Sequence, residues 1–329
     1  MTVSELAAVL HASVGDRLHA VGLAADMRVV LAGRGVALAP ADLREAFPRA
    51  SRRLAVWVHG LGVTEAIWNF PRRPRTSYGV LLERDAGFTP VFLRYNTGRS
   101  IRDSGAAADA LLEQLVAGWP VRPEEIALIG YSMGGLVLRS ALQQGSARSA
   151  SWVGLVRHTV HLGVPHRGAP LERAGRVTTS LLKALPNPWT KLVGALADLR
   201  SAGVKDLARG DLVPDGAWVP LPLTGAHHAI IGTVHRDPHH FLSWFLGDGL
   251  VPIASARAQV HGGTEVFLPE RLTVIGGVGH LALPRSSRVY PVILRALTGR
   301  TAPAGPAPRR RRPASRRQAA RRKGTLRRS

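Results

Sequence analysis

The stretch IALIGYSMGGLVLR, residues 126–139, decides the fold predicted for this chain. An apolar run leads into Ser132, and a second apolar run follows after two glycines. The first run is typical of a buried strand, and the second is typical of an amphipathic helix. A serine placed at the turn between them needs a chemical explanation.

GYSMG, residues 130–134, matches the Gly-x-Ser-x-Gly nucleophile elbow. In that motif a sharp strand-to-helix turn holds the serine hydroxyl above the sheet, and glycines flank it because side chains there would collide with neighbouring elements. The pattern alone is weak in a chain with 35 glycines. The strand before it and the helix after it supply the required context. We therefore predict that Ser132 is a nucleophile; the alternative is a glycine-rich turn with an idle serine.

Apolar runs that alternate with helical segments organise the rest of the chain. The runs predicted to be strands are residues 53–60, 89–96, 124–132, 156–165, 226–235 and 271–280. The segments predicted to be helices are residues 103–119, 133–146 and 286–299. This alternation predicts a mostly parallel central sheet with helices on both faces.

The chain divides into three expected parts. Residues 1–50 carry leucines and valines at helical spacing and predict an N-terminal helical segment, followed by a main domain over residues 51–300. Within that domain, about 170–225 has no strand pattern and is too long for a simple connection, so we expect a helical cap or lid. Residues 301–329 hold ten arginines, Lys323 and no acid, which is +11 of the net charge of +22. We expect this Arg-rich tail to be disordered.

A serine nucleophile needs a base within hydrogen-bond reach, and the base needs an orienting carboxylate. The order along the chain in this type of enzyme is serine, acid, histidine. Among thirteen histidines, His280 follows the last predicted strand in a glycine-rich loop, and His240 is the runner-up. Asp248 lies between two glycines, with Asp237 as its competitor. We predict Asp248 and His280 as acid and base.

Acyl transfer also requires donors for a developing oxyanion, and two backbone N–H groups usually serve. We expect the first from Met133, at the amino end of the predicted helix, where the helix dipole helps. We expect the second from Leu61 in VHGLG, residues 58–62, where His59 and Gly60 shape the loop.

Several motifs together resemble one known superfamily. They are VWVHGLG (56–62), IGYSMGG (129–135), HLGVPHRGAPLERAG (161–175), GDGLVP (247–252) and GVGHLALP (277–284). They look like the α/β-hydrolase superfamily, within it the lipase and serine-esterase branch that includes GPI inositol-deacylase-like proteins. The resemblance covers roughly residues 53–299 and implies an α/β-hydrolase fold with a cap insertion.

The resemblance also implies roles for single residues. It implies Ser132 as nucleophile, Asp248 as acid and His280 as base. GVPHRGAP (163–170) is similar to that branch's Gly-Thr-Pro-His-x-Gly segment, with Val164 where threonine is usual. Its histidine, His166, is implied to be structural at the edge of the site.

These patterns predict a serine esterase or lipase acting on a small-molecule or lipid ester with an apolar acyl group. We expect no metal, no cofactor and no required protein partner, and the lack of cysteine excludes thiolate catalysis. Two alternatives stay open: an acyltransferase, and a non-catalytic scaffold held to nucleic acid or an anionic membrane by the Arg-rich tail. No signal peptide or membrane-length apolar run is evident, so we expect a cytoplasmic location, with peripheral contact of the basic tail with an anionic membrane as an open option.

Overall fold

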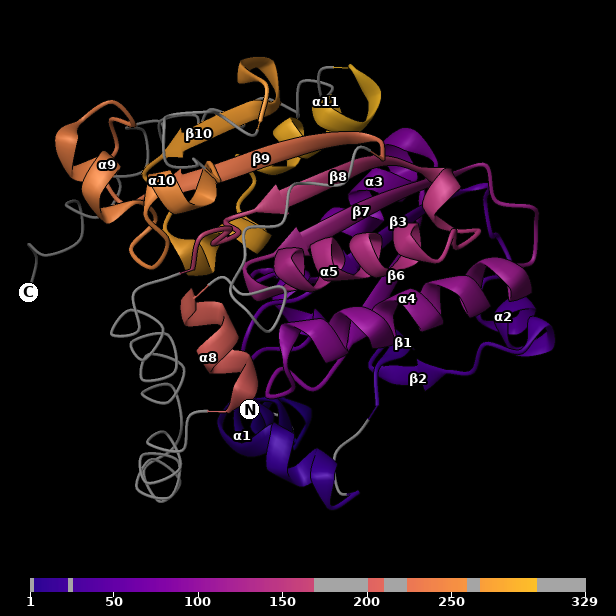
Figure 1. Ribbon diagram of the computed structural model, residues 1–329. Coiled ribbons are helices and arrows are strands. Elements are labelled where there is room, and N and C mark those ends of the chain that lie inside the picture. Colours follow the sequence, from indigo (N-terminus) through magenta and orange to yellow (C-terminus); the bar gives the residue numbers. More distant parts are fainter. Residues whose placement is uncertain (1–2, 23–25, 169–200, 210–223, 259–266, 301–329) are drawn as a thin grey trace, which may run out of the picture.

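The computed structural model describes residues 3–22, 26–168, 201–209, 224–258 and 267–300. Within these residues the strands are β1 (Arg28–Leu31), β2 (Arg34–Val36), β3 (Arg53–Val58), β4 (Asn69–Phe70), β5 (Arg73–Ser77), β6 (Thr89–Arg94), β7 (Glu125–Tyr131), β8 (Val156–Leu162), β9 (Ala226–Thr233) and β10 (Leu272–Gly276). They form an eight-stranded sheet of order β10-β9-β8-β7-β3-β6-β1-β2 and a separate β4–β5 ribbon (Figure 1).

The helices surround this sheet. The α-helices are α1 (Val3–Ala20), α2 (Pro40–Ala46), α3 (Tyr78–Ala86), α4 (Ile101–Gly118), α5 (Met133–Ala147), α8 (Ala202–Arg209), α9 (Phe241–Leu246), α10 (Ile253–Ala256) and α11 (Tyr290–Thr298). The short 3₁₀ helices are η1 (Glu65–Trp68), η2 (Val153–Leu155), η3 (Pro269–Arg271) and η4 (His280–Arg285). None of the described helices is long and apolar enough to cross a bilayer.

Strands β6, β3, β7, β8, β9 and β10 pair in parallel, which confirms the predicted mostly parallel sheet. The central strands read as continuous apolar runs because both of their faces are covered. In β3 and β7, every residue after the first is buried. Their carboxyl ends meet at one edge of the sheet, so loops that follow different strands come together there.

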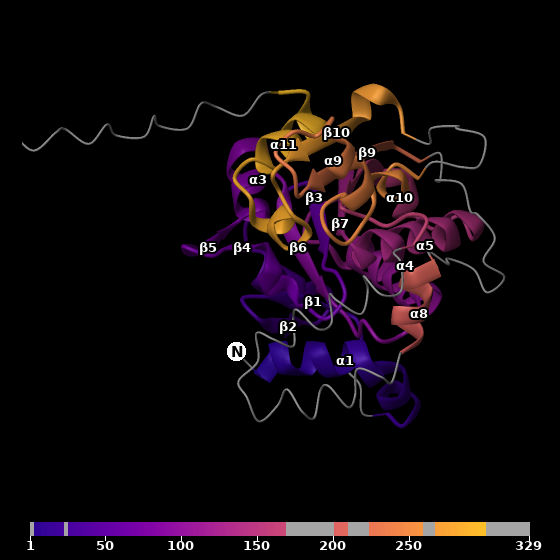
Figure 2. The ribbon, with the colours of Figure 1, turned by 90° about the vertical axis from the view of Figure 1, so that its left-hand side faces the viewer.

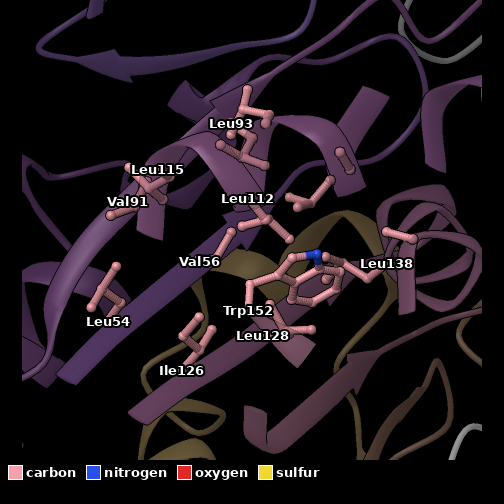
Figure 3. Close-up of a cluster of buried hydrophobic side chains, with 14 of the residues drawn as sticks. Leu54, Val56, Val91, Leu93, Leu112, Leu115, Ile126, Leu128, Leu138 and Trp152 are labelled. Carbon is pink, nitrogen blue, oxygen red and sulfur yellow. The ribbon is translucent and has the colours of Figure 1, made fainter. Parts of the chain in front are cut away.

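Helices α4 and α5 cover one face of the sheet, and α3 and α11 cover the other (Figures 1 and 2). Figure 3 shows the core beneath α4 and α5, where buried aliphatic side chains from the helices pack on those of the strands around Trp152. The labelled members are Leu54, Val56, Val91, Leu93, Leu112, Leu115, Ile126, Leu128, Leu138 and Trp152. Burial of this apolar surface is the main stabilising contribution at about 25 cal/mol per Å².

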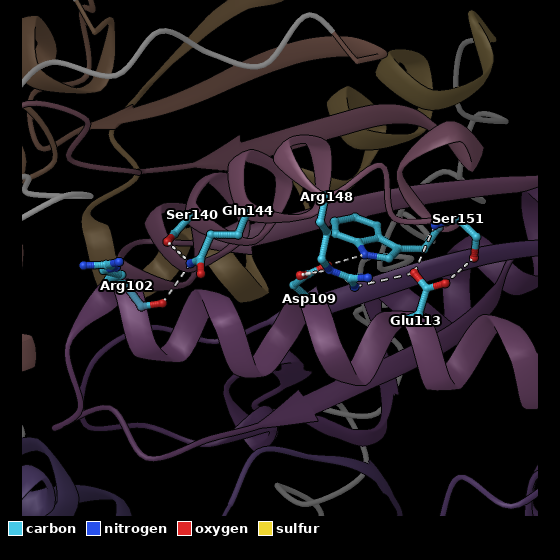
Figure 4. Close-up of polar contacts among 8 residues, drawn as sticks. Arg102, Asp109, Glu113, Ser140, Gln144, Arg148 and Ser151 are labelled. Atoms are coloured by element: carbon cyan, nitrogen blue, oxygen red, sulfur yellow. Dashed lines mark hydrogen bonds and ion pairs between the residues drawn. The ribbon is translucent and has the colours of Figure 1, made fainter.

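A polar cluster fastens α5 to α4 on the outer side of this core (Figure 4). The buried carboxylate of Asp109 accepts hydrogen bonds from Arg148 at 2.7 and 2.8 Å and from the Trp152 indole N–H at 2.7 Å. Glu113 accepts hydrogen bonds from Ser151. These bonds join α4 to the carboxyl end of α5 and the segment after it, and α5 is the helix that begins directly after Ser132.

The expectation of a purely helical segment over residues 1–50 is wrong for its middle part. Strand β1 pairs antiparallel with β6, and β2 pairs with β1, so this hairpin forms the edge of the central sheet. The turn residues Ala32 and Gly33 have φ values of 48° and 83°, as a two-residue hairpin turn requires. Val29 and Val30 are buried against the sheet, and this burial outweighs the weak helical spacing.

Helix α1 packs beside the loop that follows β6. The Asn96 side chain donates a hydrogen bond to the Gly15 carbonyl at 2.8 Å. Helix α8 lies against α1, and the Ala202 N–H donates to Asp16 at 3.0 Å. The predicted cap lies outside the described residues except for 201–209 and 224–225, and the predicted Arg-rich tail lies outside them entirely.

Candidate active site

The turn between β7 and α5 places Ser132 in a strained conformation. Its φ of 52° and ψ of −126° lie outside the regions that non-glycine residues usually adopt. The Ser132 N–H donates to the Leu162 carbonyl at 2.9 Å, and its own carbonyl accepts from Gly135 at 3.0 Å. These bonds fix the turn that the Gly-x-Ser-x-Gly pattern predicted.

The glycines around Ser132 are required by close packing. A Cβ atom on Gly130 would lie 2.4 Å from the Gly135 Cα. A Cβ atom on Gly134 would lie 2.4 Å from the Val58 carbonyl oxygen, where α5 begins against the end of β3. A side chain at either position would push the helix away from the sheet and move the serine.

The structure brings Ser132, His280 and Asp248 together from three separate loops. His280 begins η4 after strand β10, and its Nε2 atom lies 2.9 Å from the Ser132 hydroxyl oxygen. Its Nδ1 atom lies 2.6 Å from Asp248 Oδ2. The three residues are 7%, 4% and 3% exposed, in the order Ser132, His280, Asp248, so these bonds form away from bulk water.

Backbone groups orient the Asp248 carboxylate. Its Oδ1 atom accepts hydrogen bonds from the Leu250 N–H at 3.0 Å and the Val251 N–H at 2.9 Å. Because Oδ1 is held by these two donors, Oδ2 remains directed at His280. The arrangement places the proton of His280 on Nδ1 and leaves Nε2 as the acceptor for the Ser132 hydroxyl.

Two residues support this centre that the sequence analysis did not single out. The Tyr131 hydroxyl donates to the His280 carbonyl at 3.2 Å, and the two rings lie 5.1 Å apart. Gly163 has a φ of 58°, and a Cβ atom there would lie 3.2 Å from Asp248 Oδ2 and 3.3 Å from His280 Nδ1. A glycine near the end of the strand predicted over 156–165 was the available signal, but a chain with 35 glycines makes that signal weak.

The loop after β3 lies against the nucleophile turn. A Cβ atom on Gly60 would lie 3.0 Å from the Ser132 Cβ, so the loop approaches the serine closely. Leu61 and Met133 flank this contact, and both belong to one buried apolar cluster that also includes Val164 of the loop after β8. The N–H groups predicted to bind an oxyanion therefore belong to the loop after β3 and to the residue that follows Ser132.

His59 holds this loop through its ring. Its Nδ1 atom lies 2.9 Å from the Gly60 carbonyl, which can only accept, so Nδ1 carries the proton. The ring stacks on Tyr95 with the centroids 4.7 Å apart, and it is fully buried. Burial lowers the pKa of His59 to about 4, which keeps it neutral at ordinary pH.

Comparison with known proteins agrees with this architecture. The model of the PGAP1-like alpha/beta domain family matches residues 104–223, which include the nucleophile turn. The mature form of the Bacillus licheniformis lipase BlEst2 is similar in structure, with a TM-score of 0.51 and 20% identity over 74% of this chain and 91% of that chain. Its propeptide form has a TM-score of 0.51 and 21% identity over 78% of this chain and 52% of that chain. No curated protein matches the sequence significantly.

The chain has the α/β-hydrolase fold. In this fold His166 lies in the loop after β8. It is buried, and its Nδ1 atom accepts a hydrogen bond from Arg139 of α5 at 3.0 Å. Burial, and next the Arg139 charge, lower the pKa of His166 well below its usual value. This pair ties the loop after β8 to the helix that begins after Ser132.

His240 and Asp237, the alternative base and acid, lie apart from this centre. The His240 ring stacks on His235 with the centroids 4.2 Å apart. Asp237 is exposed and accepts a hydrogen bond from the His239 N–H at 2.9 Å. The described contacts of these residues belong to the loop after β9, whereas His280 and Asp248 contact each other and Ser132.

Proposed function

We propose that this chain is a serine hydrolase that cleaves carboxylic esters through an acyl-enzyme intermediate. The observation that supports the proposal is the hydrogen-bonded series from Ser132 through His280 to Asp248, buried at the carboxyl edge of the sheet. A neutral serine hydroxyl is a weak nucleophile, and an adjacent imidazole activates it.

In the proposed first step the Ser132 oxygen attacks the ester carbonyl carbon while His280 Nε2 takes the hydroxyl proton. The tetrahedral intermediate then breaks its bond to the alcohol oxygen, and the imidazolium returns the proton to that oxygen. In the second step water attacks the acyl-enzyme, with His280 as base, and the carboxylic acid leaves. Asp248 keeps the proton of neutral His280 on Nδ1 and stabilises the imidazolium that forms in each step.

The N–H groups of Leu61 and Met133 are proposed to bind the oxyanion of both tetrahedral intermediates. Two features support this role: the close approach of the loop after β3 to Ser132, and the position of Met133 at the amino end of α5. The proposal assigns no chemical role to either side chain. His59 and His166 are proposed as positioning residues, since each holds a loop that borders the centre.

An ester with an apolar acyl group is the proposed substrate class. The described surroundings of Ser132 include a buried apolar cluster to which Leu61, Met133 and Val164 contribute. Helix α8, from the region of the predicted cap, adds Val204 and Leu207 to that cluster. A proposed cap over this edge would complete the acyl site. An acyltransferase would share the first step, and an alcohol would replace water in the second.

Active-site labelling tests the proposal. A fluorophosphonate probe is expected to modify wild-type protein at Ser132, as mapped by peptide mass spectrometry, and to leave Ser132→Ala unmodified. Ser146→Ala changes an exposed serine on the same helix and is the matched control. A folded wild-type protein that resists labelling would favour the non-catalytic scaffold.

Product analysis distinguishes ester hydrolysis from acyl transfer. With p-nitrophenyl esters from acetyl to palmitoyl, we expect release of the free carboxylic acid and a preference for acyl chains longer than acetyl. Appearance of a new ester when a second alcohol is added, with little free acid, would instead support the acyltransferase.

A further inference from the structure

A second surface feature lies between the β4–β5 ribbon and the segment around the end of η4. It is a groove with a volume of about 500 Å³. Its lining residues are Phe70, Pro71, Arg72, Arg73, Thr76, Leu81, Arg285, Ser287 and Tyr290. Figure 2 looks onto the carboxyl edge of the sheet and shows the β4–β5 ribbon projecting on the side that also carries α3 and α11.

The walls of this groove are joined firmly. The Tyr78 hydroxyl lies 2.7 Å from both the Leu283 and Ser286 carbonyl oxygens, which connects the start of α3 to the end of η4. The Tyr78 ring stacks on Tyr290 at 6.2 Å and contacts Phe70 edge-on at 5.5 Å. The groove is therefore a formed feature of the fold, since buried aromatic contacts hold both of its sides.

Three arginines give the groove its charge. Arg72, Arg73 and Arg285 are exposed, and among the described residues none of them forms an ion pair. The nearby Asp85 accepts a hydrogen bond from Tyr290 at 2.6 Å and is itself paired with Arg84. That carboxylate is thus already engaged, and the three guanidinium groups remain available for an anion such as a phosphate.

The floor of the groove is apolar. Phe70 and Leu81 are half-buried, and the buried Tyr290 also belongs to the lining. A free phosphate would leave this surface uncovered. A molecule with an anionic headgroup joined to an acyl chain would use both parts, the arginines for the phosphate and the floor for the chain.

We propose that this groove binds an anionic phospholipid. Pro71 and Leu81 give the lining an aliphatic part that suits an acyl chain, and an oligonucleotide titration tests the alternative in which Phe70 and Tyr290 stack on bases. The groove and the centre are connected through η4, which begins at His280 and ends at Arg285. Bound lipid would hold the carboxyl edge of the sheet against a membrane surface. The proposal concerns binding alone and goes beyond ester hydrolysis, so it does not depend on the proposed reaction.

Calorimetric titration with a monomeric lipid tests this proposal. The full chain carrying Ser132→Ala is titrated with dihexanoylphosphatidylglycerol below its micelle concentration, so that turnover plays no part. We expect Arg73→Glu/Arg285→Glu to weaken binding at least about tenfold, since two charge-assisted bonds are lost. Arg34→Glu/Arg122→Glu changes two exposed arginines elsewhere by the same total charge and is expected to bind like the parent.

Further titrations distinguish the ligand. Dihexanoylphosphatidylcholine and inorganic phosphate are both expected to bind at least about tenfold more weakly than the anionic lipid. The first lacks a net negative charge, and the second lacks acyl chains. Equal binding of inorganic phosphate would reduce the groove to a simple anion site and overturn the proposal. If the groove variant and the control variant lose the same affinity for the lipid, net charge explains the loss and the groove does not. A single-stranded oligonucleotide that binds more tightly than the lipid, with the loss confined to the groove variant, would replace the lipid by nucleic acid.

Discussion

Asp248 and His280 are joined twice. The carboxylate of Asp248 lies 2.6 Å from His280 Nδ1, and the Asp248 backbone carbonyl accepts the His280 N–H at 2.9 Å. The side-chain bond selects the tautomer of the imidazole, while the backbone bond sets the distance between the two loops. A change that removes only the carboxylate charge should therefore leave the loops in place.

Asp248→Asn is expected to lower kcat/KM for a soluble p-nitrophenyl ester by about four orders of magnitude, because an amide N–H cannot accept the Nδ1 proton and the wrong tautomer of His280 results. The free energy of unfolding should change far less than the rate. Asp237→Asn, an exposed acid in the neighbouring loop, is the control and should retain full activity. Comparable losses from both changes would rule out the assigned role.

Gly163→Ala is expected to reduce kcat by at least about 100-fold, because the added methyl group would lie 2.7 Å from Leu283 Cδ1 and would crowd the Asp248–His280 pair. The φ of 58° at this position adds backbone strain for any residue with a Cβ atom. Gly154→Ala is the matched control, since a Cβ atom there has no heavy atom within 4 Å. Steady-state kinetics together with thermal unfolding would check this, and a fully active Gly163→Ala protein would refute the packing argument.

Leu61→Pro is expected to lower kcat about 100- to 1,000-fold, because proline has no N–H to donate to the oxyanion. Leu61→Met keeps the N–H and the approximate volume, so it should retain most of the activity. Both variants should be compared by circular dichroism before kinetics are measured. If Leu61→Met loses as much activity as Leu61→Pro, the side chain rather than the backbone group would carry the effect.

Buried histidines should make the protein sensitive to acid. Burial is the first cause that lowers the pKa of His59 to about 4 and the pKa values of His161 and His166 well below 6.5. Below pH 6.5 the unfolded chain takes up protons that these folded side chains do not bind. The free energy of unfolding should therefore be greatest above pH 6.5 and fall as the pH decreases, by up to about 1.4 kcal/mol per pH unit for each such histidine.

Urea unfolding between pH 7.5 and 5 would measure this slope. His166→Gln preserves an acceptor for Arg139 and should reduce the slope by about one proton per molecule. His239→Gln changes an exposed histidine and should leave the slope as it is. A wild-type free energy of unfolding that does not fall toward pH 5 would contradict the proposed cause.

Deleting residues 301–329 is expected to leave hydrolysis of a soluble short-chain ester nearly unchanged, because the predicted disordered tail should contribute no group to the centre. The assay would compare kcat/KM of the full and shortened chains at matched ionic strength. A collapse of activity together with a lower melting temperature would show that the tail takes part in the fold.

The strands and the Ser132 turn were predictable because each depends on neighbouring residues. A continuous apolar run, a Gly-x-Ser-x-Gly turn and an amphipathic helix all lie within residues 126–139. The choice of Asp248 and His280 required one further rule, the order of the three residues along the chain. The β1–β2 hairpin was missed because its short valine run is no stronger than the helical spacing around it, and only pairing with β6 decides its conformation.

The sequence by itself determined the α/β architecture and the candidate nucleophile, because periodicity and turn chemistry act over a few residues. Only the tertiary structure decided that Gly163 lies against Asp248 and His280, and that Arg72 and Arg73 share a groove with Arg285. These neighbours lie far apart along the chain. Their proximity results from how strands and helices pack on the sheet, and no local pattern specifies such packing.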